Sequence, residues 1–120
     1  AYNKMRFLFD GQVGILDFTK EDFEKTGCTF GQADGLVNKA LEVEGVRIAV
    51  LASEREEGIK MSLRAVEPDT VNDIAVQFGG GGHAQAAGCT VHAPLAEALD
   101  MVLAAIKKKL DATPRQEKLA

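Results

Sequence analysis

The sequence has little cysteine, no excess of positive charge and no long apolar run, and each shortage excludes a class of protein. The two cysteines, Cys28 and Cys89, stand far apart in no close-spaced motif, so we expect two reduced thiols rather than a disulfide framework. Neither a signal peptide nor an apolar run of about 18 residues is recognisable, which favours a cytoplasmic protein without a membrane span. The formal net charge of −4 excludes a broadly basic surface for duplex nucleic acid. Any contact with a nucleotide or nucleic acid must therefore be local.

What the chain does contain is the composition of an ordinary globular domain, with 46% hydrophobic and 27% charged residues. Its 120 residues are enough for one domain to bury a core of its own. We expect a lead-in over residues 1–12, a folded domain over 13–110 and a frayed tail over 111–120. The chain begins with alanine, which is consistent with a piece of a longer polypeptide, although removal of an initiator methionine would look the same.

Hydrophobic periodicity predicts an α/β fold, a small mixed sheet of about four strands with about four helices. The strands are expected at residues 12–18, 46–53, 59–66 and 88–91, and the helices at 20–27, 32–43, 71–78 and 94–110. Thr19 is expected to cap the first helix beside a staple of Phe18 and Phe23, and Asp69 or Thr70 to cap the third. The two middle strands should pair as a hairpin. The amphipathic final helix packs either within the domain or against a partner.

The most informative feature is the segment FGGGGHAQAAG at residues 78–88. Gly79 is expected to end the preceding helix in a left-handed conformation, but one cap does not explain four glycines followed by a histidine. We interpret the segment as a loop whose free backbone N–H groups converge on an anion, with His83 as an adjustable donor. A helical turn over residues 82–87 would add its positive N-terminal end. The alternative is a packing turn in which two backbones touch.

The predicted strand at residues 59–66 carries a second candidate site. Lys60, Ser62 and Arg64 alternate with apolar residues, so the three side chains project from the same face of the strand. Arginine offers a fork of donors and serine a short donor, and both suit a phosphate group. The alternative is the ordinary solvated outer face of a hairpin.

The sequence offers no evident catalytic machinery. The spacing of His83, Cys89 and His92 matches no common zinc pattern. No serine stands on a nucleophile-elbow turn, and no cluster of aspartate and histidine is present that would hold a pair of metal ions. We therefore expect no catalytic and no metal-ligating residue, and no hydrolysis by this chain alone.

Together, the segment SLR at residues 62–64 and FGGGGHAQAAG resemble the DHH-associated domain, the C-terminal half of the DHH phosphoesterase superfamily. The resemblance covers about residues 14–110, and the four-glycine version is most similar to the exopolyphosphatase-related group. That group comprises bacterial oligoribonucleases that also dephosphorylate 3′-phosphoadenosine 5′-phosphate. The resemblance implies that Arg64, with Ser62, contacts phosphate. It also implies a substrate loop made by four residues, Gly80, Gly81, Gly82 and His83.

The resemblance also implies where the chemistry resides. In such proteins an N-terminal DHH domain holds Mn²⁺ (or Mg²⁺) and performs the hydrolysis, while the associated domain holds the substrate. The DHH motif and its metal ligands are missing here, so no cofactor is expected in this chain. The implied partners are short RNA or DNA oligonucleotides or nucleotide phosphates and the N-terminal DHH domain of the same protein, with no membrane. Two alternatives stay open: a free-standing nucleic-acid-binding module, like the C-terminal domain of alanyl-tRNA synthetases, and a structural module that forms a homodimer.

Overall fold

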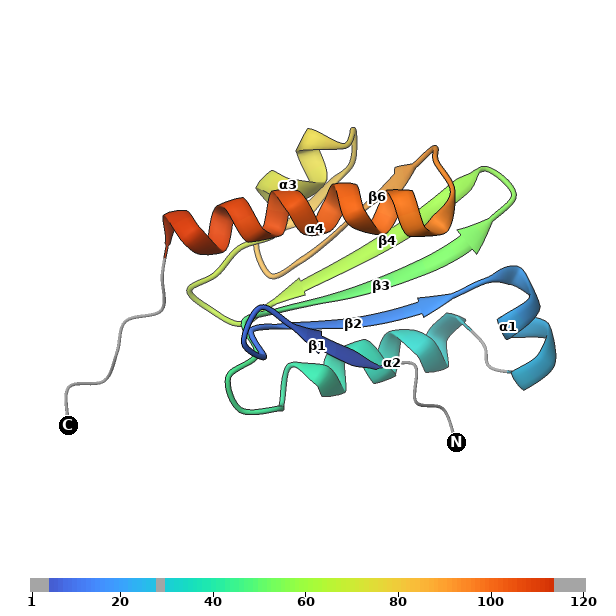
Figure 1. Cartoon of the computed structure of the whole chain (residues 1–120), viewed down its shortest axis with the longest axis horizontal. Coiled ribbons are helices and arrows are strands. Elements are labelled where there is room, and N and C mark those ends of the chain that lie inside the picture. The colour runs from blue at the N-terminus through green and yellow to red at the C-terminus, as the bar shows by residue number, and fades with distance from the viewer. Residues whose placement is uncertain (1–4, 28–29, 114–120) are drawn as a thin grey trace.

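A mixed sheet of six strands, in the order β1-β2-β3-β4-β6-β5, forms the middle of the computed structural model, which describes residues 5–27 and 30–113 (Figure 1). The strands are β1 Arg6–Leu8, β2 Val13–Phe18, β3 Ile48–Arg55, β4 Gly58–Ala65, β5 Gly81–His83 and β6 Ala86–Val91. The helices are α1 Lys20–Thr26, α2 Phe30–Ala40, α3 Asn72–Gln77 and α4 Leu95–Ala112. β2 and β3 run parallel, and the other neighbouring strands run antiparallel. The α/β class is confirmed, and β3 and β4 form the predicted hairpin.

The sheet has two strands more than the sequence predicts. β1 lies within residues 1–12 and pairs with β2. β5 lies inside the glycine run and pairs with β6 across a tight turn at Ala84 and Gln85, so the helical turn predicted over residues 82–87 is wrong. The glycines of this run allow the backbone of β5 to approach β6 closely, and the resulting ladder satisfies backbone groups that one helical turn would leave unpaired.

Helices cover the two faces of the sheet unequally. α3 and α4 pack on one face, where Val50 and Ile106 belong to the same buried core. α2 packs on the opposite face, mainly over β2 and β3, where Val37 contacts the core around Leu51. Figure 1 shows these strands between α4 and α2. In the described part of the chain, the α2-side surface of β4, β6 and β5 carries no helix of its own, and we refer to this surface as the open face.

Local sequence signals account for both ends of α1. Thr19 forms a capping box with Asp22, because each backbone N–H donates to the other residue's side chain, at 2.8 and 3.0 Å. Phe18 and Phe23 stack with ring centroids 4.9 Å apart, and Gly27 ends α1 with φ of 67°. The predicted cap and staple are confirmed, and the helix ends within one residue of its predicted end.

The final helix, α4, packs within the domain, because its buried residues join the core of the α3 side. The sequence leaves open whether this helix packs within the domain or against a partner, and packing within the domain is confirmed for its apolar stripe. None of the helices among the described residues combines the length and the apolar character needed to cross a membrane.

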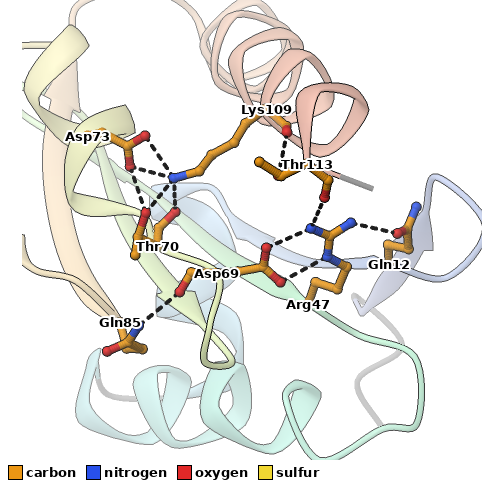
Figure 2. Close-up of polar contacts among 8 residues, drawn as sticks. All are labelled: Gln12, Arg47, Asp69, Thr70, Asp73, Gln85, Lys109 and Thr113. Carbon is orange, nitrogen blue, oxygen red and sulfur yellow. Dashed lines mark hydrogen bonds and ion pairs between the residues drawn. The ribbon is translucent and has the colours of Figure 1, made fainter. Parts of the chain in front are cut away.

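A buried ion pair anchors the connection between β4 and α3 (Figure 2). Arg47 is 7% exposed and donates to both oxygens of Asp69, at 2.9 and 2.6 Å, and to Gln12 Oε1 at 3.1 Å. The hydrogen bonds to Asp69 raise the pKa of Arg47 although burial acts in the opposite direction. The side-chain amide of Gln85 donates to the Asp69 carbonyl at 2.9 Å, so the same connection holds the turn between β5 and β6.

This arrangement also explains why the predicted cap of α3 is wrong. The N-cap residue is Val71, and no side chain caps the backbone N–H groups of the first turn. The Asp69 carboxylate is engaged by Arg47, and the Thr70 hydroxyl accepts from Lys109 at 2.6 Å. The side chains of Asp69 and Thr70, which the sequence predicts as caps, are therefore bound by residues distant in sequence instead.

Lys109 joins α4 to α3 through an ion pair with Asp73, in which Nζ and Oδ1 lie 2.6 Å apart. Burial raises the pKa of Asp73, but the hydrogen bond and charge of Lys109, together with hydrogen bonds from the backbone and Thr70, outweigh burial and hold this pKa below the ordinary carboxyl value. A pKa that is lowered by folding stabilises the folded state above the ordinary value of about 4. The contribution is lost as the pH falls through the lowered pKa.

We expect Asp73→Asn to lower the free energy of unfolding at pH 7 by at most about 1 kcal/mol, because this carboxylate is half exposed. Urea unfolding of the wild type and the variant between pH 7 and pH 3 measures the difference. The two curves should begin to converge below about pH 4, because Asp73 of the unfolded wild type takes up a proton before Asp73 of the folded protein. A difference that stays constant over this range would contradict the assignment.

Candidate functional site

The open face is organised in three rows of residues that lie side by side across β4, β6 and β5. Directly paired residues of neighbouring strands point to the same face of a sheet, so the pairing register assigns each row. One row is Ser62, Gly88 and Gly81, the next is Arg64, Ala86 and His83, and a third begins with Lys60 and Thr90. The fold thus brings Arg64, Gly81 and His83 to one surface.

The floor of this surface is formed by very small residues. On β6 the residues that point to the open face include Ala86 and Gly88, and Gly81 continues the floor on β5. A cavity of about 480 Å³ lies beside the third row, the one that contains Lys60 and Thr90. Its lining residues include Lys60, Gly79, Gly80, Gly88, Thr90 and His92. A ligand over Ala86, Gly88 and Gly81 would lie close to the backbone, because none of these residues has a side chain larger than a methyl group.

Gly79 ends α3, as predicted. It adopts φ of 83°, and its N–H donates to the Val76 carbonyl at 3.0 Å. The following N–H, of Gly80, donates to the Ala75 carbonyl at 2.8 Å. These two bonds form a Schellman motif, which closes the last turn of the helix. Gly79 is therefore explained by the fold without a ligand.

Close contact between backbones accounts for two more glycines of the run. A Cβ atom at Gly80 would lie 2.1 Å from the Gly88 carbonyl oxygen, and one at Gly82 would lie 2.6 Å from Ala87 Cα. At Gly81, by contrast, a Cβ would meet no heavy atom within 4 Å, and the backbone has no positive φ. The packing interpretation fits Gly80 and Gly82, whereas the fold places no such demand on Gly81.

The backbone N–H groups of β5 do not converge, which corrects the loop expected from the sequence. The Ala65 N–H donates to the Gln85 carbonyl at 3.0 Å, and alternation along β6 then turns the polar backbone atoms of Ala86 and Gly88 toward β5. Two of the three residues of β5, Gly81 and His83, are thereby committed to the ladder. Only Gly82 of this strand aims its N–H outward from the sheet edge.

Arg64 is anchored on the open face but remains accessible. Its Nη2 atom lies 2.7 Å from Asp34 Oδ1 on α2, and its Nη1 atom donates to the Leu63 carbonyl at 3.1 Å. The side chain is 19% exposed, and these bonds engage two of its five N–H donors. Ser62 lies deeper, at 7% exposure, and His83 is exposed at the edge.

Two other candidates from the sequence, Cys89 and His92, line the cavity of about 480 Å³, whose lining does not include Arg64, Gly81 or His83. Cys89 is buried on the α3 side of the sheet, where burial raises the pKa of its thiol and makes it less reactive. Cys28 lies outside the described residues. Across residues 5–27 and 30–113, no three residues of the histidine, cysteine, aspartate and glutamate types gather as a metal site would require.

Sequence reasoning missed two features. Asp34 carries no local signal, because it comes from another element and meets Arg64 only in the folded chain. A second cavity, of about 730 Å³, lies beside Arg47, Asp69 and Lys109. Those three side chains are engaged with one another or with α3 and its connection, so this cavity offers no comparable set of available donors.

Comparison with known proteins gives consistent matches. The family model of the DHHA1 domain matches residues 11–112. The bifunctional oligoribonuclease and PAP phosphatase NrnA of Thermus thermophilus is 38% identical over 79 residues, which cover 65% of this chain and 24% of that protein. The protein of the same name from Bacillus subtilis is 32% identical over 73 residues, covering 61% and 23%. The chain thus spans roughly a quarter of the length of these curated relatives.

A solved structure supports the same comparison. The crystal structure of an exopolyphosphatase-related protein from Bacteroides fragilis superposes with a TM-score of 0.78 and 31% sequence identity. The superposition covers 88% of this chain and 31% of that one. The similarity therefore extends over most of this chain.

Proposed function

Because this chain belongs to the DHHA1 domain family, we propose that it holds the substrate of a DHH-family phosphoesterase. The proposed substrates are short oligonucleotides or nucleotide phosphates, in keeping with the names of the relatives from Thermus thermophilus and Bacillus subtilis. Hydrolysis would reside in an N-terminal DHH domain that holds Mn²⁺ (or Mg²⁺). This chain would contribute binding and orientation, which can supply a large part of catalysis.

The observation that carries the proposal is the gathering of Arg64, Gly81 and His83 on one surface with a floor of very small residues. The available N–H donors of Arg64 suit a terminal phosphate, since a guanidinium holds phosphate oxygens in a fork. The glycine floor would allow a sugar or base to lie against backbone. His83, exposed beside Ala86, would add a donor at the rim.

The charge of the chain fits a short substrate. A formal net charge of −4 repels a long polyanion, whereas one arginine in a defined geometry is sufficient for the first nucleotide. The described residues provide no set of ligands for a pair of metal ions, so we assign no step of the hydrolysis to them. Their role is to bind and orient.

A titration of the chain with a 5′-phosphorylated dinucleotide and its unphosphorylated twin tests the proposal. We expect the phosphorylated ligand to shift the backbone amide signals of residues 79–88 and of β4 around Arg64. Arg64→Ala should weaken binding of the phosphorylated ligand by about tenfold or more, the value of a charge-assisted hydrogen bond. The unphosphorylated twin should bind more weakly and respond little to the substitution.

The matched control is Arg6→Ala, which removes the same charge from β1 at the opposite edge of the sheet. This control should leave the affinity nearly unchanged, because Arg6 is half exposed and lies outside the open face. Equal binding of both ligands, or an equal loss in the two variants, would show that the open face does not recognise phosphate.

A further inference from the structure

Asp34 is the negatively charged residue that pairs with the donors of Arg64 at the border of the open face. The two side chains form an ion pair of 2.7 Å between Nη2 and Oδ1. Asp34 belongs to α2, which borders the open face, and its side chain is 31% exposed. The carboxylate therefore stands beside the place where a phosphate would meet Arg64.

This pairing changes what Arg64 offers to an anion. A guanidinium next to a carboxylate forms a nearly neutral pair, so its attraction for a distant anion is small. At contact, the remaining N–H donors still hold a phosphate by direction and distance. The carboxylate meanwhile repels the bound anion, and this repulsion doubles when the anion carries two charges instead of one.

We propose that Asp34 determines the charge preference of the phosphate site, by penalising a dianionic phosphate more than a monoanionic one. This inference rests on the proposed function, because it concerns the same site. The Asp34–Arg64 pair would make the site select phosphate through hydrogen-bond geometry rather than through net charge. Free dianions, such as inorganic phosphate, would then compete poorly with a nucleotide that also contacts the glycine floor.

Asp34→Asn isolates the charge from the geometry. An asparagine Oδ1 still accepts a hydrogen bond from Arg64, whereas the negative charge is removed. For an anion about 6 Å from the carboxylate in water-like surroundings, the loss of repulsion corresponds to about threefold in affinity for one charge and about tenfold for two. The affinity of the variant should therefore increase more for the dianion than for the monoanion.

The experiment compares two dinucleotides by calorimetric titration at pH 8. One carries a 5′-phosphate, which is dianionic at this pH, and the other carries a 5′-methyl phosphate with a single charge. Asp34→Asn should raise affinity for the first about tenfold and for the second about threefold. The matched control is Asp111→Asn, which makes the same change in net charge at the end of α4, in a 2.8 Å pair with Lys107.

Each outcome has a definite meaning. An unchanged or reduced affinity of the Asp34→Asn variant would show that Asp34 only positions Arg64. An equal gain of affinity in the Asp111→Asn control would show that the gain comes from the change in net charge and not from the place of Asp34. Either result overturns the inference while leaving the proposed function in place, provided the wild type prefers the phosphorylated ligand. Absence of binding in all proteins would overturn the proposed function and this inference together.

Discussion

Gly80→Ala is expected to lower the free energy of unfolding by about 3 kcal/mol or more, at the upper end of what overpacking costs. The new Cβ would lie 2.1 Å from the Gly88 carbonyl oxygen and 2.7 Å from Cys89 Cβ. The nearest of these atoms is backbone of β6, which cannot move aside without disturbing the ladder with β4. For a domain of this size the midpoint of thermal unfolding should fall by about 10 °C or more.

Gly81→Ala is the matched control, because it adds the same methyl group one residue further along the run. No heavy atom lies within 4 Å of its Cβ, so stability should stay the same or rise by about 0.5 kcal/mol through a less flexible unfolded chain. The methyl group would, however, stand on the floor of the open face. Thermal unfolding of both variants, with titration of Gly81→Ala by a phosphorylated dinucleotide, measures the two effects.

The contrast between the two variants decides between packing and binding. Weaker ligand binding by a fully stable Gly81→Ala variant would identify Gly81 as a binding position. A Gly81→Ala variant as unstable as Gly80→Ala would show that the whole run serves packing, and unaltered affinity would remove Gly81 from the proposed site.

The second large effect is expected at the buried ion pair of Arg47 and Asp69. Asp69→Ala should lower the free energy of unfolding by about 3–5 kcal/mol, because it leaves a buried guanidinium without its anion. Arg47 is 7% exposed and donates twice to Asp69, so the substitution removes two charge-assisted hydrogen bonds from a largely buried guanidinium (Figure 2). Urea unfolding measures the loss. Asp17→Ala, at the exposed pair with Arg6, is the control and should cost about 1 kcal/mol or less.

A double variant identifies the cause of the loss. Replacing both partners, as Arg47→Met with Asp69→Leu, removes the buried charge together with its partner, and such replacements are often close to neutral. We therefore expect the double variant to recover much of the stability that Asp69→Ala loses. A double variant as unstable as the single one would show that the carboxylate acts mainly through the local conformation of the β4–α3 connection.

Several features of the fold were predictable because their causes lie within a few residues. The capping box of Thr19 and Asp22 is a local exchange of hydrogen bonds. The β3–β4 hairpin follows from two apolar strands joined by a short charged turn. The common face of Ser62 and Arg64 follows from the strand period of two. In each case the sequence contains both partners of the interaction close together.

The role of the individual glycines was not predictable from the run itself. Glycine has no side chain and little preference for strands, so the sequence does not mark residues 81–83 as β5. The strand is defined by its pairing with β6, and the place of β6 in the sheet depends on its pairing with β4, which is distant in sequence. Only the tertiary structure therefore distinguishes Gly80 and Gly82, which touch β6, from Gly81 on the open face.

By itself, the sequence determined the α/β class, the family resemblance and the candidates Arg64 and His83, since motif, alternation and capping are all local or linear properties. The tertiary structure decided that these candidates share one surface, because strand pairing sets the register that aligns Arg64 with Ala86 and His83. It also decided the partners of the charged groups, Asp34 for Arg64 and Asp69 for Arg47. Such pairs join segments far apart in the chain, and their identity depends on how helices cover the sheet, which no short stretch of sequence specifies.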